Sequence, residues 1–209
     1  MVNNNIWKGI TISLILILIV TNVYWFTQQN KENYSEENYL LMTLMKADAD
    51  ISKISISDQK AESYYNEASF AYEDGNYNLV GSNCRLARDY YSEESQGYKR
   101  IKAELKSTEI EDKLIKLYIE KLDLNSEISL NMFEACEYFE SASRYYDKYF
   151  NTNVPYDDSS YDMGTGEIDM MGEKIEDHDR NVRDYNDKLE EYRVELKLRI
   201  DAFSEDSAL

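Results

Sequence analysis

Acidic and hydroxyl side chains alternate in one short stretch, with the spacing that a calcium-binding loop uses. Asp158, Ser160 and Asp162 match the first, third and fifth ligand positions of an EF-hand loop. The match ends there, because Met163 stands where the loop needs glycine and Asp169 stands where it needs a bidentate glutamate. Aspartate and serine are also common in exposed connections. The sequence therefore favours an ordinary connection over a calcium site, and we expect no cofactor.

His178 is the only histidine, so histidine-based chemistry would depend on this single residue. Its place in the helical pattern faces the core, and the carboxylates near it alternate with Lys174 and Arg180, which is typical of a solvated helix face. The paired Glu-x-x-His motifs of a di-iron bundle are missing. No catalytic set converges, so we expect no enzyme, and a hydrolase or metalloenzyme is the least favoured class.

The two cysteines, Cys84 and Cys136, raise the alternative of a disulfide. If Leu105 and Ile110 face each other across a helix turn, Cys84 lies opposite Asn131. Cys136 is then about five residues, or roughly 7 to 8 Å, further along the helix. This offset exceeds the usual Cα separation of a disulfide. We therefore predict two buried free thiols.

The composition excludes some partners and favours long helices. The formal net charge of -18 disfavours nucleic acid and anionic lipid surfaces, which attract lysine and arginine. A partner protein with a basic surface fits this charge better. Seven glycines and one proline among 209 residues leave few helix breakers.

Residues 9–30 carry no charged side chain and are long enough to cross a bilayer, which takes about 20 residues. Trp7 precedes this stretch and Trp25 lies near the end of its apolar part. Aromatic residues are enriched at these two positions, the membrane–water interfaces, in membrane-spanning helices. The alternative is a signal peptide, but its apolar region is about 7 to 15 residues long and ends in small residues. We predict a short tail at residues 1–8 and an uncleaved single-pass anchor at residues 9–30.

The orientation of this anchor follows from the basic residues around it. Lys8 and the terminal amine precede the span, whereas acidic residues follow Lys31 closely. This arrangement predicts a cell-membrane protein whose acidic body, residues 31–209, lies outside the cytoplasm.

Apolar residues beyond the anchor recur in alternating steps of four and three, which is the heptad pattern of packed helices. The predicted helices cover residues 36–74, 76–106, 108–150 and 167–203. Asp58 interrupts the first apolar seam, Glu94 the second, and Lys121 and Asn131 the third. The predicted fold is all-α: an antiparallel up-down-up-down four-helix bundle or coiled-coil bundle.

Residues 151–166 are predicted to form a loop, because they contain Pro155, Gly164 and Gly166. Connections between antiparallel helices normally take about 2 to 8 residues, and a longer one is more often functional or disordered. This stretch combines aromatic rings with negative charge, which suits contact with a basic partner. The candidate partner-binding residues are Tyr156, Asp157, Asp158, Tyr161 and Asp162. A plain flexible connection is the alternative.

One fragment, residues 64–91, resembles a tetratricopeptide repeat hairpin. The matching aromatic, small, glycine, tyrosine and alanine positions are Tyr64, Ala68, Gly75, Tyr77 and Ala87. The resemblance covers about one repeat, and Val80 and Cys84 depart from the pattern. A solenoid needs at least three repeats, so the resemblance implies no peptide-binding function.

These observations predict a membrane-anchored helical bundle that acts as a protein-interaction or structural spacer module. A ligand-binding or sensor bundle is the alternative, and it would need an internal cavity. Small seam residues could leave such a cavity: Ala61, Ala68, Ala87 and Ala135.

Overall fold

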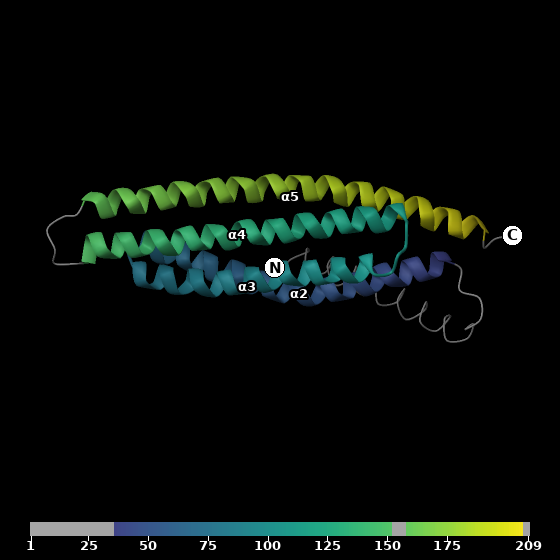
Figure 1. Ribbon diagram of the computed structural model, residues 1–209, viewed down its shortest axis with the longest axis horizontal. Coiled ribbons are helices and arrows are strands. Elements are labelled where there is room, and N and C mark those ends of the chain that lie inside the picture. Colours follow the sequence, from purple (N-terminus) through teal and green to yellow (C-terminus); the bar gives the residue numbers. More distant parts are fainter. Residues whose placement is uncertain (1–35, 152–157, 207–209) are drawn as a thin grey trace, which may run out of the picture. The chain divides into compact units, whose positions relative to one another are not determined.

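The computed structural model describes residues 36–151 and 158–206, which form four α-helices (Figure 1). They are α2 (Glu36–Glu73), α3 (Tyr77–Lys106), α4 (Lys113–Asn151) and α5 (Asp158–Asp206). These ranges contain no strand, so the described part of the chain is all-α, in agreement with a helical bundle. The predicted tail at 1–8 and anchor at 9–30 lie outside the described residues. None of the four described helices is long and apolar enough to cross a membrane.

The chain divides into two compact units, Met1–Asp48 and Ala49–Leu209. The described part of the first unit, residues 36–48, is the first stretch of α2. The second unit contains residues 49–73 of α2 together with α3, α4 and α5.

The turn between α2 and α3 closes around Gly75, as the sequence predicts. Gly75 has a φ of 72°, a left-handed conformation that glycine adopts without strain. Its N–H donates to the Tyr72 carbonyl at 3.0 Å, and the Asn76 N–H donates to the Ala71 carbonyl at 2.8 Å. This is the Schellman pattern of a helix C-terminus. The Asn76 side chain then caps α3 by accepting from the Leu79 N–H at 3.3 Å.

The connection between α3 and α4 is longer than predicted, and the predicted helix start at residue 108 is wrong. Thr108 Oγ1 donates to the Leu105 carbonyl at 2.7 Å, which closes α3, and Glu109 has a left-handed φ of 56°. Helix α4 begins only at Lys113. Asp112 caps it, because its carboxylate accepts from the Leu114 N–H at 2.7 Å.

Helix α5 begins at Asp158, so the predicted loop at 151–166 is wrong from residue 158 onward. Asp158 suits a helix N-terminus, where the helix dipole favours negative charge. Gly164 belongs to the helix because it packs against a ring: a Cβ built there would lie 2.9 Å from Tyr146 Cε1. This glycine serves a close contact between α4 and α5 and does not break the helix.

Helix α4 packs against α3 on one side and α5 on the other (Figure 1). Antiparallel pairing of α3 with α4 is seen in the contact between Ser95 and Ser126, and in that between Arg85 and Glu140. Residues 49–73 of α2 pack on α3 and α4 through a core of small residues and rings: Ala61, Ala68, Ala71, Val80, Cys84, Ala87, Tyr91, Met132, Cys136 and Phe139.

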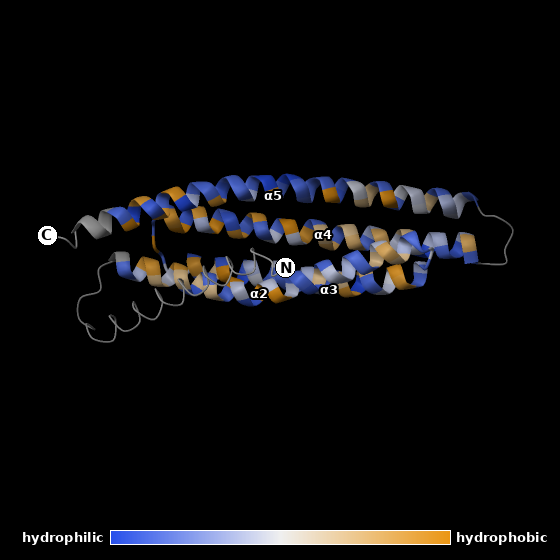
Figure 2. Cartoon of the chain, turned by 180° about the vertical axis from the view of Figure 1, so that it is seen from behind, coloured by the Kyte–Doolittle hydropathy of each residue, from blue (hydrophilic) through white to orange (hydrophobic). Residues whose placement is uncertain are grey.

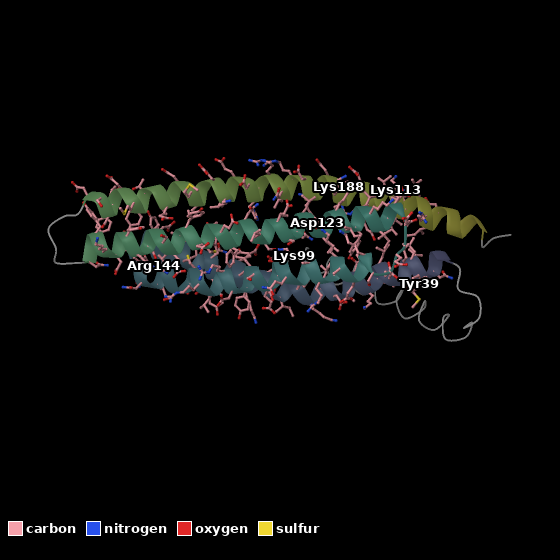
Figure 3. All side chains as sticks on the ribbon, in the orientation of Figure 1. Tyr39, Lys99, Lys113, Asp123, Arg144 and Lys188 are labelled. Carbon is pink, nitrogen blue, oxygen red and sulfur yellow. The ribbon has the colours of Figure 1, made fainter. Side chains whose placement is uncertain are left out.

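Helix α5 is the least buried helix of the second unit. Tyr192 is its one buried apolar side chain within the described residues, and Figure 2 shows α5 largely in hydrophilic colours. The apolar seam predicted within residues 167–203 is only partly buried, as at Ile168, Ile175, Val182 and Leu189. Ion pairs also join α5 to α4: Lys113 Nζ lies 2.6 Å from Glu195 Oε2, and Lys188 Nζ lies 3.0 Å from Glu120 Oε2 (Figure 3).

Candidate functional site

Aromatic rings from all four helices meet at the end of the second unit where α2 joins α3. We call this group the end cluster, and its members are Tyr72, Tyr77, Tyr146, Tyr149, Phe150 and Tyr161. Tyr146 lies at its centre, with ring centroids 5.9 Å from Tyr72, 5.6 Å from Tyr77 and 5.7 Å from Tyr161. The rings are tilted or edge-on in these pairs, which is the favourable geometry of aromatic contacts.

The end cluster is buried at its centre and open at its rim. Tyr146 is 5% exposed, whereas Phe150 is 54% exposed and Tyr161 45%. The exposed Phe150 ring packs against two half-buried rings, with centroids 4.7 Å from Tyr149 and 5.7 Å from Tyr77. The result is a contiguous aromatic surface whose rings are held in place before any partner binds.

The structure places the predicted partner-binding residues unevenly. Tyr161 is a member of the end cluster, and Asp158 and Asp162 are exposed in the first turns of α5. Tyr156 and Asp157 lie outside the described residues. The helical backbone from residue 158 also rules out an EF-hand loop at these positions. In the ranges 36–151 and 158–206, no three His, Cys, Asp or Glu side chains gather so that they could hold a metal ion.

A polar hollow of about 140 Å³ lies beside Tyr77, between α3 and α4. Its lining is Tyr77, Asn78, Gly81, Arg85, Glu140, Ser143, Arg144 and Asp147. It is smaller than the roughly 300 to 1,000 Å³ of typical ligand sites. It does not favour the ligand-binding alternative, because its charged groups already engage one another.

Glu140 is the centre of these polar contacts. Its side chain is 3% exposed and pairs with Arg85 Nε at 3.4 Å, with an Arg88 terminal nitrogen at 3.3 Å and with Arg144. Arg144 is labelled in Figure 3. At the other end of the hollow, the Asp147 carboxylate accepts from the Asn78 amide at 3.3 Å. The arrangement joins α3 to α4 beside the end cluster.

The polar interruptions of the first two predicted seams form a second polar centre, deeper in the bundle. Glu94 on α3 is buried, with 6% exposure, and this burial raises its pKa, followed by the charge of Asp58 on α2. Burial raises the pKa of Asp58, and the charge of His178 on α5 partly opposes this rise. His178 itself is half-buried, and its Nδ1 lies 3.1 Å from Asp179 Oδ1 of the same helix. We call Asp58 and Glu94 the carboxyl layer.

Both thiols are free and buried, as predicted, but the register used to predict them is wrong. Cys84 and Cys136 belong to the same core cluster, whereas the predicted register places Cys84 opposite Asn131. The cause is the late start of α4 at Lys113, which moves its residues along α3. Burial raises the pKa of both thiols, and each also responds to the charge of Arg88.

Sequence reasoning missed the polar residues that α4 buries: Ser126, Ser129, Glu140 and Ser143. The signal that could have found them is a second apolar seam with the same alternating steps of three and four, displaced by one residue from the predicted seam. Its members are Ile115, Leu122, Met132, Phe139 and Tyr146. Two adjacent seams on one helix indicate a helix with neighbours on two sides, as α4 has.

No protein-family model, curated protein or solved structure matches this chain. The fragment that resembles a tetratricopeptide repeat forms the turn between α2 and α3, which are 38 and 30 residues long. A whole repeat of that family has about 34 residues in two helices, so these helices are too long for it. Ala68 and Ala87 are buried and Gly75 is left-handed, so the shared residues serve the helix turn.

Proposed function

We propose that this chain is a single-pass protein of the cell membrane, anchored through residues 9–30. Its up-down-up-down helical bundle lies outside the cytoplasm and acts as a protein-interaction or spacer module. The observation that carries the interaction role is the exposed rim of the end cluster, with Phe150 and Tyr161 at the surface. No enzymatic activity belongs to this proposal.

The rim has the composition of a protein-binding surface. Tyrosine, phenylalanine and methionine are enriched at interfaces, where they supply apolar contact area. A contiguous exposed apolar patch often marks a site of protein interaction, whereas single exposed apolar residues are ordinary. Because Tyr146 and Tyr149 hold Phe150 and Tyr161 in place, a partner would meet rings that lose little conformational freedom on binding.

Carboxylates around the end cluster indicate the charge of the partner. Asp158 and Asp162 flank Tyr161 in the chain and are exposed, and the Asp147 carboxylate accepts hydrogen bonds from the side-chain amides of Asn78 and Asn151. Negative charge beside rings attracts lysine and arginine, which also stack on aromatic faces. A protein with a basic surface therefore fits this end of the bundle.

Site-specific photocrosslinking in the native membrane tests the interaction. A photoreactive phenylalanine analogue at Tyr161 should form a discrete adduct with a partner protein, and the same analogue at exposed Val194 should not. The adduct at residue 161 should disappear when Phe150→Ser is introduced. The control variant Val194→Ser also removes an exposed apolar group and should leave the adduct unchanged. Equal adducts at 161 and 194 would contradict the proposal.

Terminal sequencing of the protein from native membranes tests the anchor. The uncleaved anchor requires residues before Gly9 to be recovered. A mature terminus near Gln28 or later would show a cleaved signal peptide. Protease added to intact cells should digest residues 31–209, because the body is proposed to lie outside the cytoplasm, and resistance in intact cells would reverse the orientation.

A further inference from the structure

The carboxyl layer puts acidic residues where the heptad pattern calls for apolar ones. Asp58 interrupts the seam of α2, and Glu94 interrupts the seam of α3. The Glu94 side chain is buried and accepts a hydrogen bond from the Tyr98 hydroxyl at 3.2 Å. This neutral donor on α3 holds the Glu94 carboxyl in the interior. Beside the layer, Ile54 of α2 lies directly against Gly97 of α3, so α2 and α3 are in close contact here.

The titratable and polar groups that act on the layer, or on the tyrosines beside it, come from all four helices. Asp58 and Glu62 belong to α2, Tyr91 and Tyr98 to α3, Ser129 and Cys136 to α4, and His178 and Tyr185 to α5. The charges that act on Glu94 are those of Asp58 and Glu62, and both are negative. His178 is the group of this set that can carry a positive charge, and it acts on Asp58.

Burial is the largest influence on Glu94 and raises its pKa to about 7, with the Asp58 charge acting in the same direction. The nearby Ser129 hydroxyl and the hydrogen bond from Tyr98 partly oppose this rise. Burial also raises the pKa of Asp58, followed by the charge of Glu62, while His178 lowers it. Two neighbouring carboxyls that both resist ionisation retain a proton more readily than either alone.

We propose that the carboxyl layer is a proton-responsive joint between α2 and α3. When the layer holds a proton, α2 and α3 pack closely. When both carboxyls are ionised, they repel each other inside the bundle and the packing of α2 on α3 loosens. The layer would make the rigidity of the bundle depend on the acidity of its surroundings near neutral pH.

The sign of the effect follows from the raised pKa. Between the ordinary glutamate value of 4.5 and about 7, the folded chain binds more protons at Glu94 than the unfolded chain does. The stability of the folded state therefore falls as the pH rises through this window. Above about pH 7 the contribution of Glu94 no longer changes with pH.

Thermal unfolding of the full-length chain in mild detergent, followed by circular dichroism from pH 5 to 8, tests the proposal. The melting temperature of the unmodified chain should fall with pH. Glu94→Gln should show a shallower fall and a higher melting temperature than the unmodified chain at pH 8. Glu93→Gln removes the same charge from an exposed neighbouring position and should keep the original slope. Equal slopes for Glu94→Gln and the unmodified chain would overturn the proposal.

A direct titration keeps the proposal testable if Glu94→Gln does not fold. The side-chain carboxyl carbon of Glu94, followed by NMR in the full-length chain, should titrate with a midpoint near pH 7. Asp58→Asn removes the neighbouring negative charge, so it should move this midpoint to lower pH. A midpoint at the ordinary glutamate value, or one that Asp58→Asn leaves unchanged, would overturn the proposal.

Discussion

The side-chain oxygens of Ser95 and Ser126 lie 2.9 Å apart in the buried interface between α3 and α4. This hydrogen bond marks the register of the two helices. It agrees with the pairing of Arg85 with Glu140 nearer the end cluster, and with the placement of Cys84 and Cys136 in one core cluster. These small side chains allow α3 and α4 to approach closely here, and each hydroxyl gives the other a hydrogen-bond partner.

Removing one hydroxyl of this pair should leave the other buried without its partner. We expect Ser126→Ala to lower the free energy of unfolding by about 1 to 2 kcal/mol. The double variant with Ser95→Ala should lose less than the sum of the two single variants, because neither hydroxyl is then left unpaired. Urea denaturation provides the measurement, and exposed Ser82→Ala is the control, with an expected change within about 0.5 kcal/mol. Strict additivity would show that the two hydroxyls are not coupled.

Gly97 lets the Ile54 side chain of α2 lie directly against the backbone of α3. A Cβ built on Gly97 would lie 2.7 Å from Ile54 Cδ1 and 2.9 Å from Ile54 Cγ1. We expect Gly97→Ala to destabilise the fold by about 1 to 3 kcal/mol despite the better helix propensity of alanine. Ile54→Val shortens the opposing side chain, so the double variant should lose less than the two single variants together.

The control for this experiment is Gly172, which lies within α5 and has open space around its Cβ position. Gly172→Ala should stabilise the chain by about 0.5 to 1 kcal/mol through helix propensity alone. If Gly97→Ala were to stabilise the chain as Gly172→Ala does, the proposed contact between Gly97 and Ile54 would be wrong.

The thiols should be unreactive while the chain is folded. Burial raises the pKa of Cys136 to about 12 and that of Cys84 still further, so neither forms an appreciable thiolate at pH 8. We expect Ellman's reagent to label both cysteines only as fast as the chain unfolds. Ser82→Cys introduces an exposed thiol two residues from Cys84 and should react at once. Rapid labelling of the unmodified chain in native buffer would contradict the buried positions of the cysteines.

Glu140 should contribute more to stability than a surface carboxylate does. Glu140→Gln leaves Arg85, Arg88 and Arg144 without their common partner. We expect a loss of about 2 kcal/mol, below the ~3 to 5 kcal/mol of a fully buried pair because two of these arginines can turn toward solvent. Exposed Glu137 also pairs with Arg88, at 3.7 Å, so Glu137→Gln is a matched control that should change stability by less than about 1 kcal/mol. Denaturation at two salt concentrations would measure the free energy of unfolding of both variants. Equal losses of stability for Glu140→Gln and Glu137→Gln would contradict the central role of Glu140.

Local signals in the sequence were enough to predict the helices and the turn at Gly75. The predicted ranges 36–74 and 76–106 lie close to α2 and α3. Heptad spacing and a left-handed glycine at a helix end both depend only on residues that are close together in the sequence. The starts of α4 and α5 were not predictable in this way. Gly164 looks like a helix breaker until Tyr146 of α4 is placed against it.

The candidate site was also predictable only in part from the sequence. The sequence pointed to Tyr161 and its acidic neighbours, and it marked Asp58 and Glu94 as exceptions in their seams. Only the tertiary structure decided that Tyr161 joins rings from three other helices and that Asp58 acts on Glu94. Heptad spacing defines which face of a helix is buried, but it does not define how far one helix is shifted along the next. That shift depends on side-chain contacts between residues distant in the sequence, such as Ser95 with Ser126.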